Sequence, residues 1–197
     1  MFIPANTIRI WAGHLGSAGL TIKQVLQDMM ITPLFPVPPE IFAANVSYND
    51  FAAGETLTPR PGVTLRTAKL HHPDQATGYR IEYGGRSICY LTDTQHVIGK
   101  PDQEVLSLIE GADLMIYDST YTDEEYQRKV GWGHSSVGQV VELAHDAKVK
   151  TLYLFHHDPD QSDDDIDAKL KAAVGLLGER KSSTRCVAPA EGQCVKI

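Results

Sequence analysis

Four strand-like segments each end beside a polar side chain that can bind a metal ion. His72 follows the segment that ends at Leu70, and Asp93, Asp118 and His156 stand at the ends of three later segments. Neutral imidazole and carboxylate are the ligands that zinc and similar divalent cations take in proteins. A single histidine at a strand end is more often an ordinary loop residue, but four such ends in one chain predict a metal site.

The elements that would position these side chains alternate between strand and helix patterns. Residues 63–70 alternate apolar with polar side chains, and Gly84 and Gly85 separate two strand-like runs, 79–83 and 86–91, which predicts a β-hairpin. The other expected strands are 7–11, 114–117, 151–155 and a closing strand from Val187 and 194–197; the expected helices are 17–30, 102–110, 136–147 and one that begins near Ser162. The prolines between 33 and 39 predict a surface loop. This order predicts one layered α/β domain over residues 1–197.

Composition and charge restrict the function classes. A chain of 197 residues with 42% hydrophobic residues is typical of one globular domain, and no apolar run approaches the ~18 residues that span a membrane. The net charge of −7 does not attract nucleic acid, so a polyanionic substrate would need a local positive centre. Three cysteines without a C-x-x-C pair and no visible secretory signal favour the cytoplasm.

Four short segments carry a family resemblance. HPDQATGYR at 72–80, YLTDT at 90–94, WGHSS at 132–136 and LFHHDP at 154–159 resemble the later motifs of the metallo-β-lactamase-fold hydrolases. The resemblance is to the phosphodiesterase branch, which includes ribonuclease Z and cyclic-nucleotide phosphodiesterases, and it runs from about Val63 to the end of the chain. It implies an αββα sandwich whose strand-end loops hold two metal ions.

The resemblance also implies a role for each candidate residue. His72 would bind one metal ion, His156 would bind the second, and Asp93 would bridge both. His134 would be a catalytic histidine that faces the scissile phosphate without binding metal, and Asp118 would orient it. The cofactors would be two divalent ions, zinc first, with manganese or iron as alternatives.

One motif of the family is missing from this sequence. These hydrolases carry an early His-x-His-x-Asp-His motif that supplies two ligands to each metal, and this chain has no His-x-His. The opening residues 2–11 resemble a stretch that follows that motif. We therefore expect a sandwich that is incomplete at its N-terminus, corresponding to the C-terminal two-thirds of a complete family domain.

Other candidates have ordinary explanations. His71 is expected to be a solvated neighbour of His72, and His157 to hydrogen-bond a loop. The acidic run after His157 suggests a calcium loop, but an EF-hand needs Gly at its sixth position and Glu at its twelfth, where this chain has Asp163 and Lys169. Ser162 capping a helix with an acidic first turn explains the run better.

Two functional hypotheses remain. The first is a metal-dependent hydrolase of phosphodiester bonds with a dinuclear site and a bridging hydroxide; its substrate would be a small phosphodiester or nucleotide, with RNA not indicated by the charge. The second is a truncated, catalytically silent relative that acts as a binding or assembly module. Its uncovered sheet edge would favour pairing with another chain, for example as a homodimer, and no membrane is involved.

Overall fold

The computed structural model describes residues 1–97 and 99–197, which form two compact units, Met1–Ala53 and Gly54–Ile197. The single domain expected over residues 1–197 stays a prediction. No helix among the described residues is long and apolar enough to cross a membrane.

The first unit is a parallel pair of strands with one α-helix. β1 (Thr7–Gly13) pairs with β2 (Asn45–Phe51) in register from Thr7 opposite Asn45. The helix expected over 17–30 is divided: a 3₁₀ turn at Leu15–Ala18 comes first, and α1 (Ile22–Met29) begins only after Thr21, whose hydroxyl accepts a hydrogen bond from the backbone of Gln24. The proline-rich loop contains a further 3₁₀ turn, Pro39–Ile41.

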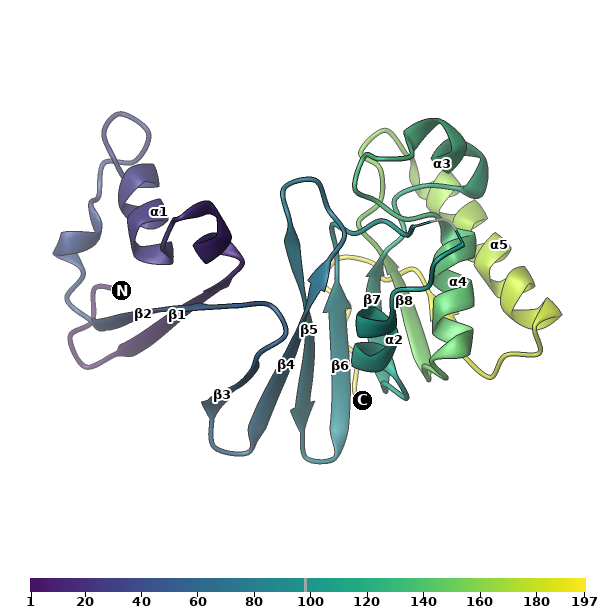
Figure 1. Cartoon of the computed structure of the whole chain (residues 1–197), viewed down its shortest axis with the longest axis horizontal. Helices are drawn as coiled ribbons and strands as arrows, with labels where there is room; N and C mark the ends of the chain where they lie inside the picture. The colour runs from purple at the N-terminus through teal and green to yellow at the C-terminus, as the bar shows by residue number, and fades with distance from the viewer. Residues whose placement is uncertain (98) are drawn as a thin grey trace. The chain divides into compact units, whose positions relative to one another are not determined.

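The second unit contains a seven-stranded mixed sheet in the order β3-β4-β5-β6-β7-β8-β9. Its strands are β3 (Thr56–Arg60), β4 (Val63–Leu70), β5 (Ala76–Tyr83), β6 (Arg86–Leu91), β7 (Leu114–Asp118), β8 (Thr151–Phe155) and β9 (Arg185–Val187). Each of the first four strands is antiparallel to its neighbour, and β7, β8 and β9 run parallel to β6 (Figure 1). The closing strand is β9 alone. Residues 194–197, which were expected to take part in it, form no strand.

The predicted hairpin is confirmed. Gly84 and Gly85 join β5 to β6 with φ of 57° and 75°, a backbone that side chains with a Cβ rarely adopt. Two left-handed residues give the tight turn whose twist matches the two strands. The strands on either side of this turn therefore have a fixed register.

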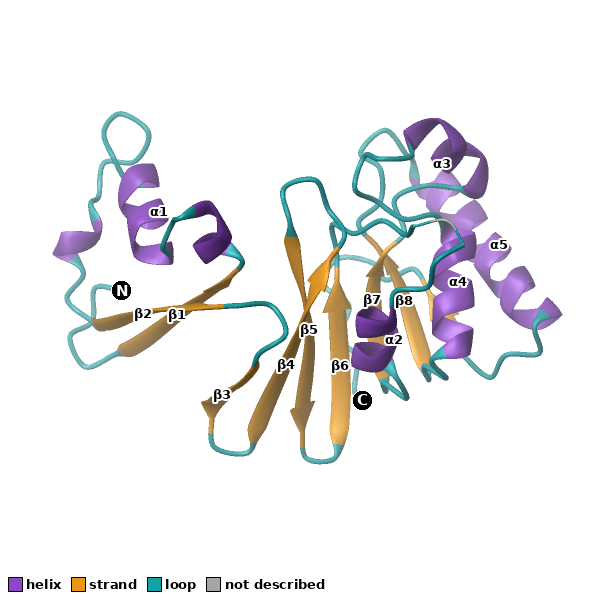
Figure 2. Ribbon diagram, viewed as in Figure 1, coloured by secondary structure: helices purple, strands orange, loops and turns teal. Residues whose placement is uncertain are grey.

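Three helices cover one face of the sheet (Figure 2). These are α2 (Gln103–Ile109), α4 (Val137–Asp146) and α5 (Asp163–Glu179), while α3 (Asp123–Lys129) follows β7. Asp102, Ser136 and Ser162 are the N-caps of the three, and Ser162 forms a capping box with Asp165, as expected in place of a calcium loop. The core between sheet and helices includes Cys89, Leu91, Tyr117, Val140 and Leu154.

The second face of the sheet is also apolar. Ile81 lies opposite Ile88, and Tyr90 lies opposite Ile116, so these side chains share the face that the helices leave open. Both Ile81 and Tyr90 are partly exposed. A sheet with apolar side chains on both faces is built for the middle of a layered α/β sandwich, which is the predicted fold class.

Candidate metal centre

The direction of the strands brings the candidate residues to one edge of the sheet. β4 and β6 are both antiparallel to β5, and β7 and β8 run parallel to β6, so all four end at the same edge. His72, Asp93, Asp118 and His156 stand at those four ends, and His134 lies in the loop before α4. The topology therefore gathers residues that are as far as 84 positions apart in the sequence, from His72 to His156.

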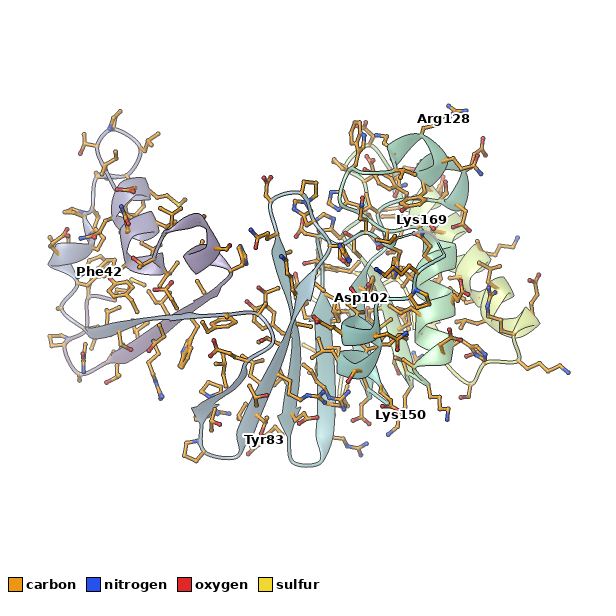
Figure 3. All side chains as sticks on the ribbon, viewed as in Figure 1. Phe42, Tyr83, Asp102, Arg128, Lys150 and Lys169 are labelled. Carbon is orange, nitrogen blue, oxygen red and sulfur yellow. The ribbon has the colours of Figure 1, made fainter. Side chains whose placement is uncertain are left out.

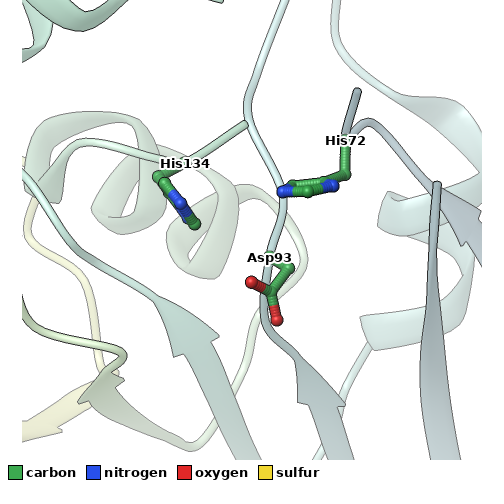
Figure 4. Close-up of side chains that lie close together, drawn as sticks. All are labelled: His72, Asp93 and His134. Carbon is green, nitrogen blue, oxygen red and sulfur yellow. The ribbon is translucent and has the colours of Figure 1, made fainter. Parts of the chain in front are cut away.

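Two overlapping groups of ligand atoms result. One ligand atom each from His72, Asp93 and His134 lie within 4.8 Å of one another, and the same holds for Asp118, His134 and His156. Figure 4 shows the first three side chains facing a common space from separate segments. In addition, His156 Nε2 lies 3.3 Å from Asp93 Oδ1. Asp93 therefore stands between the two predicted histidine ligands, His72 and His156.

Asp93 and His156 share an unusual backbone conformation. Their φ values are 57° and 59°, in the left-handed region that non-glycine residues seldom occupy. Such residues cost free energy on the order of 1 kcal/mol or more and cluster at functional sites. In this chain the left-handed turn occurs at the two strand ends whose side chains meet.

Asp118 is buried and held from several sides. Its side chain is 0% exposed, and its two oxygens accept hydrogen bonds from the backbone of Thr94, Thr120 and Ser135 at 3.1–3.3 Å and from the Thr120 hydroxyl at 2.7 Å. Burial alone would raise the pKa of Asp118, but the hydrogen bonds from His134 and Thr120 outweigh it and the pKa lies below its ordinary value. Asp118 is therefore an ionised acceptor whose oxygens are already occupied.

His134 is oriented by Asp118. Its Nδ1 lies 2.9 Å from Asp118 Oδ2, and because an ionised carboxylate only accepts, Nδ1 carries the hydrogen. This hydrogen bond raises the pKa of His134 above its ordinary value. The ring stacks on His156 with centroids 4.9 Å apart and meets the edge of Tyr121 at 6.0 Å. His134 Nε2 is therefore the ring nitrogen that Asp118 does not hold.

Gly133 leaves space for the ring of His72. A Cβ at this position would contact the ring of His72 at Cδ2, with Nε2 and Pro73 Cδ each 2.8 Å away. Its φ of +93° is also in the range that favours glycine. The neighbouring amides of Gly131 and Gly133 both donate to Gln95 Oε1 at 3.1 Å, which fixes the loop that carries His134.

His71 and His157, which adjoin His72 and His156 in the sequence, belong to neither group of ligand atoms. His71 is exposed, with its Nε2 3.9 Å from Asp102. His157 has a buried Nδ1 without a hydrogen-bond partner among the described residues, and burial lowers its pKa to about 4. Thr120, which contacts both Asp118 and His156, was not among the residues predicted from the sequence. Its position two residues after the strand-end aspartate was the available signal.

The donor set suits a divalent metal in kind, and each of the two groups offers three donor atoms. Two imidazoles and one carboxylate are zinc ligands, and Gly133 leaves His72 the space it needs. Asp118 belongs to the second group, but its oxygens already accept hydrogen bonds from Thr94, Thr120, His134 and Ser135.

Comparison with known proteins identifies relatives of this chain. Residues 18–157 match the family model described as beta-lactamase superfamily domain. The Ribonuclease Z of Brevibacillus brevis is 34% identical over 87 residues, covering 44% of this chain and 26% of that protein. The Ribonuclease Z of Streptomyces avermitilis is 27% identical over 165 residues, covering 65% of this chain and 55% of that protein.

Solved structures share the fold. The metallo-beta-lactamase fold protein YhfI from Bacillus subtilis superposes with a TM-score of 0.63 at 18% identity, over 93% of this chain and 63% of that chain. The short form of human tRNase Z superposes with a TM-score of 0.58 at 20% identity, over 80% of this chain and 63% of that chain. The chain spans 26% of the length of the Brevibacillus brevis Ribonuclease Z and 55% of that of Streptomyces avermitilis. Its family match runs across both compact units, and on that ground the chain belongs to the beta-lactamase superfamily, with ribonuclease Z proteins among its relatives.

Proposed function

We propose that this protein is a metal-dependent hydrolase of phosphodiester bonds. The observation that carries the proposal is the position of Asp93, whose carboxylate lies 3.3 Å from His156 Nε2 and within 4.8 Å of a nitrogen of His72. A carboxylate has two oxygens and can bridge two ions, while each histidine holds one. Zinc is the first candidate, with manganese or iron as alternatives.

The residues around the ions would divide the chemistry. Two bound dications would supply an activated water and positive charge opposite the phosphate oxygens. His134 would give a proton from Nε2 to the leaving oxygen, because its Nδ1 is held by Asp118 and its raised pKa keeps the ring charged more often at neutral pH. Asp118 would keep His134 in this orientation and stabilise its positive charge.

The substrate class follows from the same arrangement. The chain carries a net charge of −7, so the metal ions would provide the positive centre for a phosphodiester. Small phosphodiesters and nucleotides fit this proposal, and the ribonuclease Z relatives extend it to RNA. The proposal therefore names phosphodiester hydrolysis as the reaction and nucleotides or RNA as the natural substrates.

The number of ligands limits the activity of this chain alone. A stable zinc site usually takes at least three protein ligands, and with His134 and Asp118 in the roles proposed above each ion would have one histidine and a shared carboxylate. We therefore expect weak metal binding and slow turnover from this chain.

The test is hydrolysis of bis(p-nitrophenyl) phosphate by the purified chain with added zinc or manganese. We expect slow, metal-dependent turnover that His72→Ala abolishes and His71→Ala leaves unchanged, since His71 is exposed beside the site. Equal activity in the two variants, or activity that a chelator does not affect, would contradict the proposal. No turnover together with no metal uptake would favour the alternative, a silent binding or assembly module, which no specific contact supports.

A further inference from the structure

Thr120 occupies a position between the two parts of the metal centre. Its side chain is 4% exposed, and its hydroxyl oxygen lies 2.7 Å from Asp118 Oδ1, 2.7 Å from the carbonyl oxygen of His156 and 3.2 Å from His156 Nδ1. One hydroxyl group therefore meets three polar atoms that belong to two residues of the site.

Counting hydrogens assigns the direction of these contacts. A hydroxyl has one hydrogen to donate, and the Asp118 carboxylate and the His156 carbonyl can only accept. If the hydroxyl donated to His156 Nδ1, two oxygen–oxygen contacts of 2.7 Å would have no hydrogen between them. The hydroxyl must therefore donate to one of these oxygens and accept a hydrogen bond from His156 Nδ1.

The two nearby carboxylates attract a hydrogen to opposite ring nitrogens. Asp118 Oδ2 lies 3.9 Å from His156 Nδ1 and Asp93 Oδ1 lies 3.3 Å from His156 Nε2, so charge does not choose the tautomer, and the contacts of the Thr120 hydroxyl decide it. With the hydrogen on Nδ1, the other ring nitrogen has a free lone pair. That atom, Nε2, is the one that lies 3.3 Å from Asp93 Oδ1.

We propose that Thr120 is a positioning residue that holds His156 in its Nδ1–H tautomer and so presents the unprotonated Nε2 beside Asp93. The metal-related consequence rests on the proposed function, because Nε2 is then ready to bind the ion that Asp93 shares. The tautomer itself is a property of the metal-free protein. A hydrogen bond to the remote nitrogen of a metal-binding histidine commonly sets its tautomer and ring orientation.

The backbone of Thr120 is fixed by groups from outside the site. Lys169, labelled in Figure 3 and 2% exposed, extends from α5 and donates from Nζ to the carbonyl oxygens of Ser119 at 2.9 Å and Thr120 at 3.1 Å. Gln161 Nε2 donates to the same Thr120 oxygen at 3.2 Å. These bonds hold the Thr120 hydroxyl where His156 meets it.

The direct test is nitrogen NMR of the metal-free chain labelled with ¹⁵N-histidine. At a pH of about 8, well above the ordinary histidine pKa of about 6.5, long-range ¹H–¹⁵N correlations distinguish the two neutral tautomers. We expect His156 to show Nδ1–H in the wild type and in Thr120→Ser. In Thr120→Val, which keeps the shape and removes the hydroxyl, we expect a shift towards Nε2–H, the form that an unconstrained histidine prefers.

Controls separate this role from general damage. Thr184→Val removes another buried hydroxyl, which donates to the carbonyl of Val149, and should leave His156 unchanged. His72 in the same spectra should also be unaffected by Thr120→Val. If Thr120→Val does not fold, the wild-type spectrum alone still decides, because an Nε2–H form of His156 there would overturn the proposal. An unchanged Nδ1–H form in folded Thr120→Val would overturn it as well.

Zinc binding gives a second readout. Loss of a hydrogen bond that supports a metal ligand typically weakens metal affinity by about 10- to 100-fold. We expect about a tenfold loss in Thr120→Val and recovery in Thr120→Ser. If the wild type binds no zinc, the proposed function fails, while the tautomer result in the metal-free chain still tests Thr120.

Discussion

At the scale of single residues, the site consists of two carboxylates, one buried and one partly exposed, and three imidazoles. Asp118 is fully occupied by hydrogen bonds and orients His134, while Asp93 remains partly exposed between His72 and His156. The two aspartates therefore differ in environment: the oxygens of Asp118 are buried and occupied by hydrogen bonds, whereas the carboxylate of Asp93 is more exposed and meets His156 Nε2 at 3.3 Å. Neither difference is visible in the amino-acid types.

His134 provides the first prediction at this scale. One of its ring nitrogens lies close enough to His72 and Asp93 to act as a ligand, whereas the proposed role is proton transfer. We expect His134→Ala to lower metal-dependent turnover of bis(p-nitrophenyl) phosphate about 100-fold or more while the metal content stays the same. The measurement is the rate beside the zinc content of the same samples. A parallel loss of zinc would identify His134 as a ligand instead.

A second prediction at this scale concerns Gly133. Gly133→Ala should lower both stability and zinc affinity, because a Cβ there contacts the His72 ring and Pro73. Gly131→Ala is the matched control, since Gly131 has nearly the same φ, +91°, and open space around its Cβ position. Both variants should lose about 1 kcal/mol from the left-handed backbone. Only Gly133→Ala should also lose zinc affinity, and equal affinities would show that the contact with His72 is unimportant.

At the scale of elements, the strands that place the site were largely predictable. Residues 63–70 and 86–91 alternate apolar with polar side chains, the glycine pair marks the turn between β5 and β6, and β4 and β6 have the expected bounds. α3 was missed although Thr122 and Glu125 form a capping box that can be read in the sequence. β2 was missed for a physical reason: Asn45, Ser47 and Asn49 disfavour strands, and only pairing with β1 places them in one.

The segment after β6 gives a pH prediction. His96 stacks on Tyr117 with centroids 5.7 Å apart, its Nε2 has no partner among the described residues, and burial lowers its pKa to about 4. The unfolded chain, with a histidine pKa of about 6.5, binds the proton more readily. The stability that the folded chain gains from a neutral, buried His96 is therefore present above about pH 6.5 and is lost as the pH falls towards 4.

The measurement is urea unfolding of the wild type and His96→Gln at pH values of about 7 and 5. We expect the wild type to lose on the order of 1–2 kcal/mol more than the variant between the two pH values, since glutamine does not titrate in this range. His157, whose pKa burial also lowers to about 4, is present in both proteins and so drops out of the difference. Identical losses would mean that His96 is charged or exposed in the folded chain.

At the scale of the whole molecule, strand order is what the sequence could not provide by itself. The four strand ends were recognised as candidates one by one, but their meeting at one edge depends on β4, β6, β7 and β8 running in one direction. The resemblance in the four motifs supplied that arrangement in advance, and the family match over residues 18–157 confirms the family. The hydrogen bonds of Thr120 depend on both strand order and local turns, and its place two residues after Asp118 was the one signal in the sequence.

The central claim is that Asp93 serves two metal ions together with His72 and His156. The most direct measurement is a zinc titration of the metal-free chain against a competing chelator, with zinc content determined in parallel, for the wild type, Asp93→Asn, His72→Ala and His71→Ala. We expect weak uptake of two ions by the wild type and by His71→Ala, loss of one ion in His72→Ala, and loss of both in Asp93→Asn. Uptake by Asp93→Asn with the stoichiometry and affinity of the wild type would contradict the account.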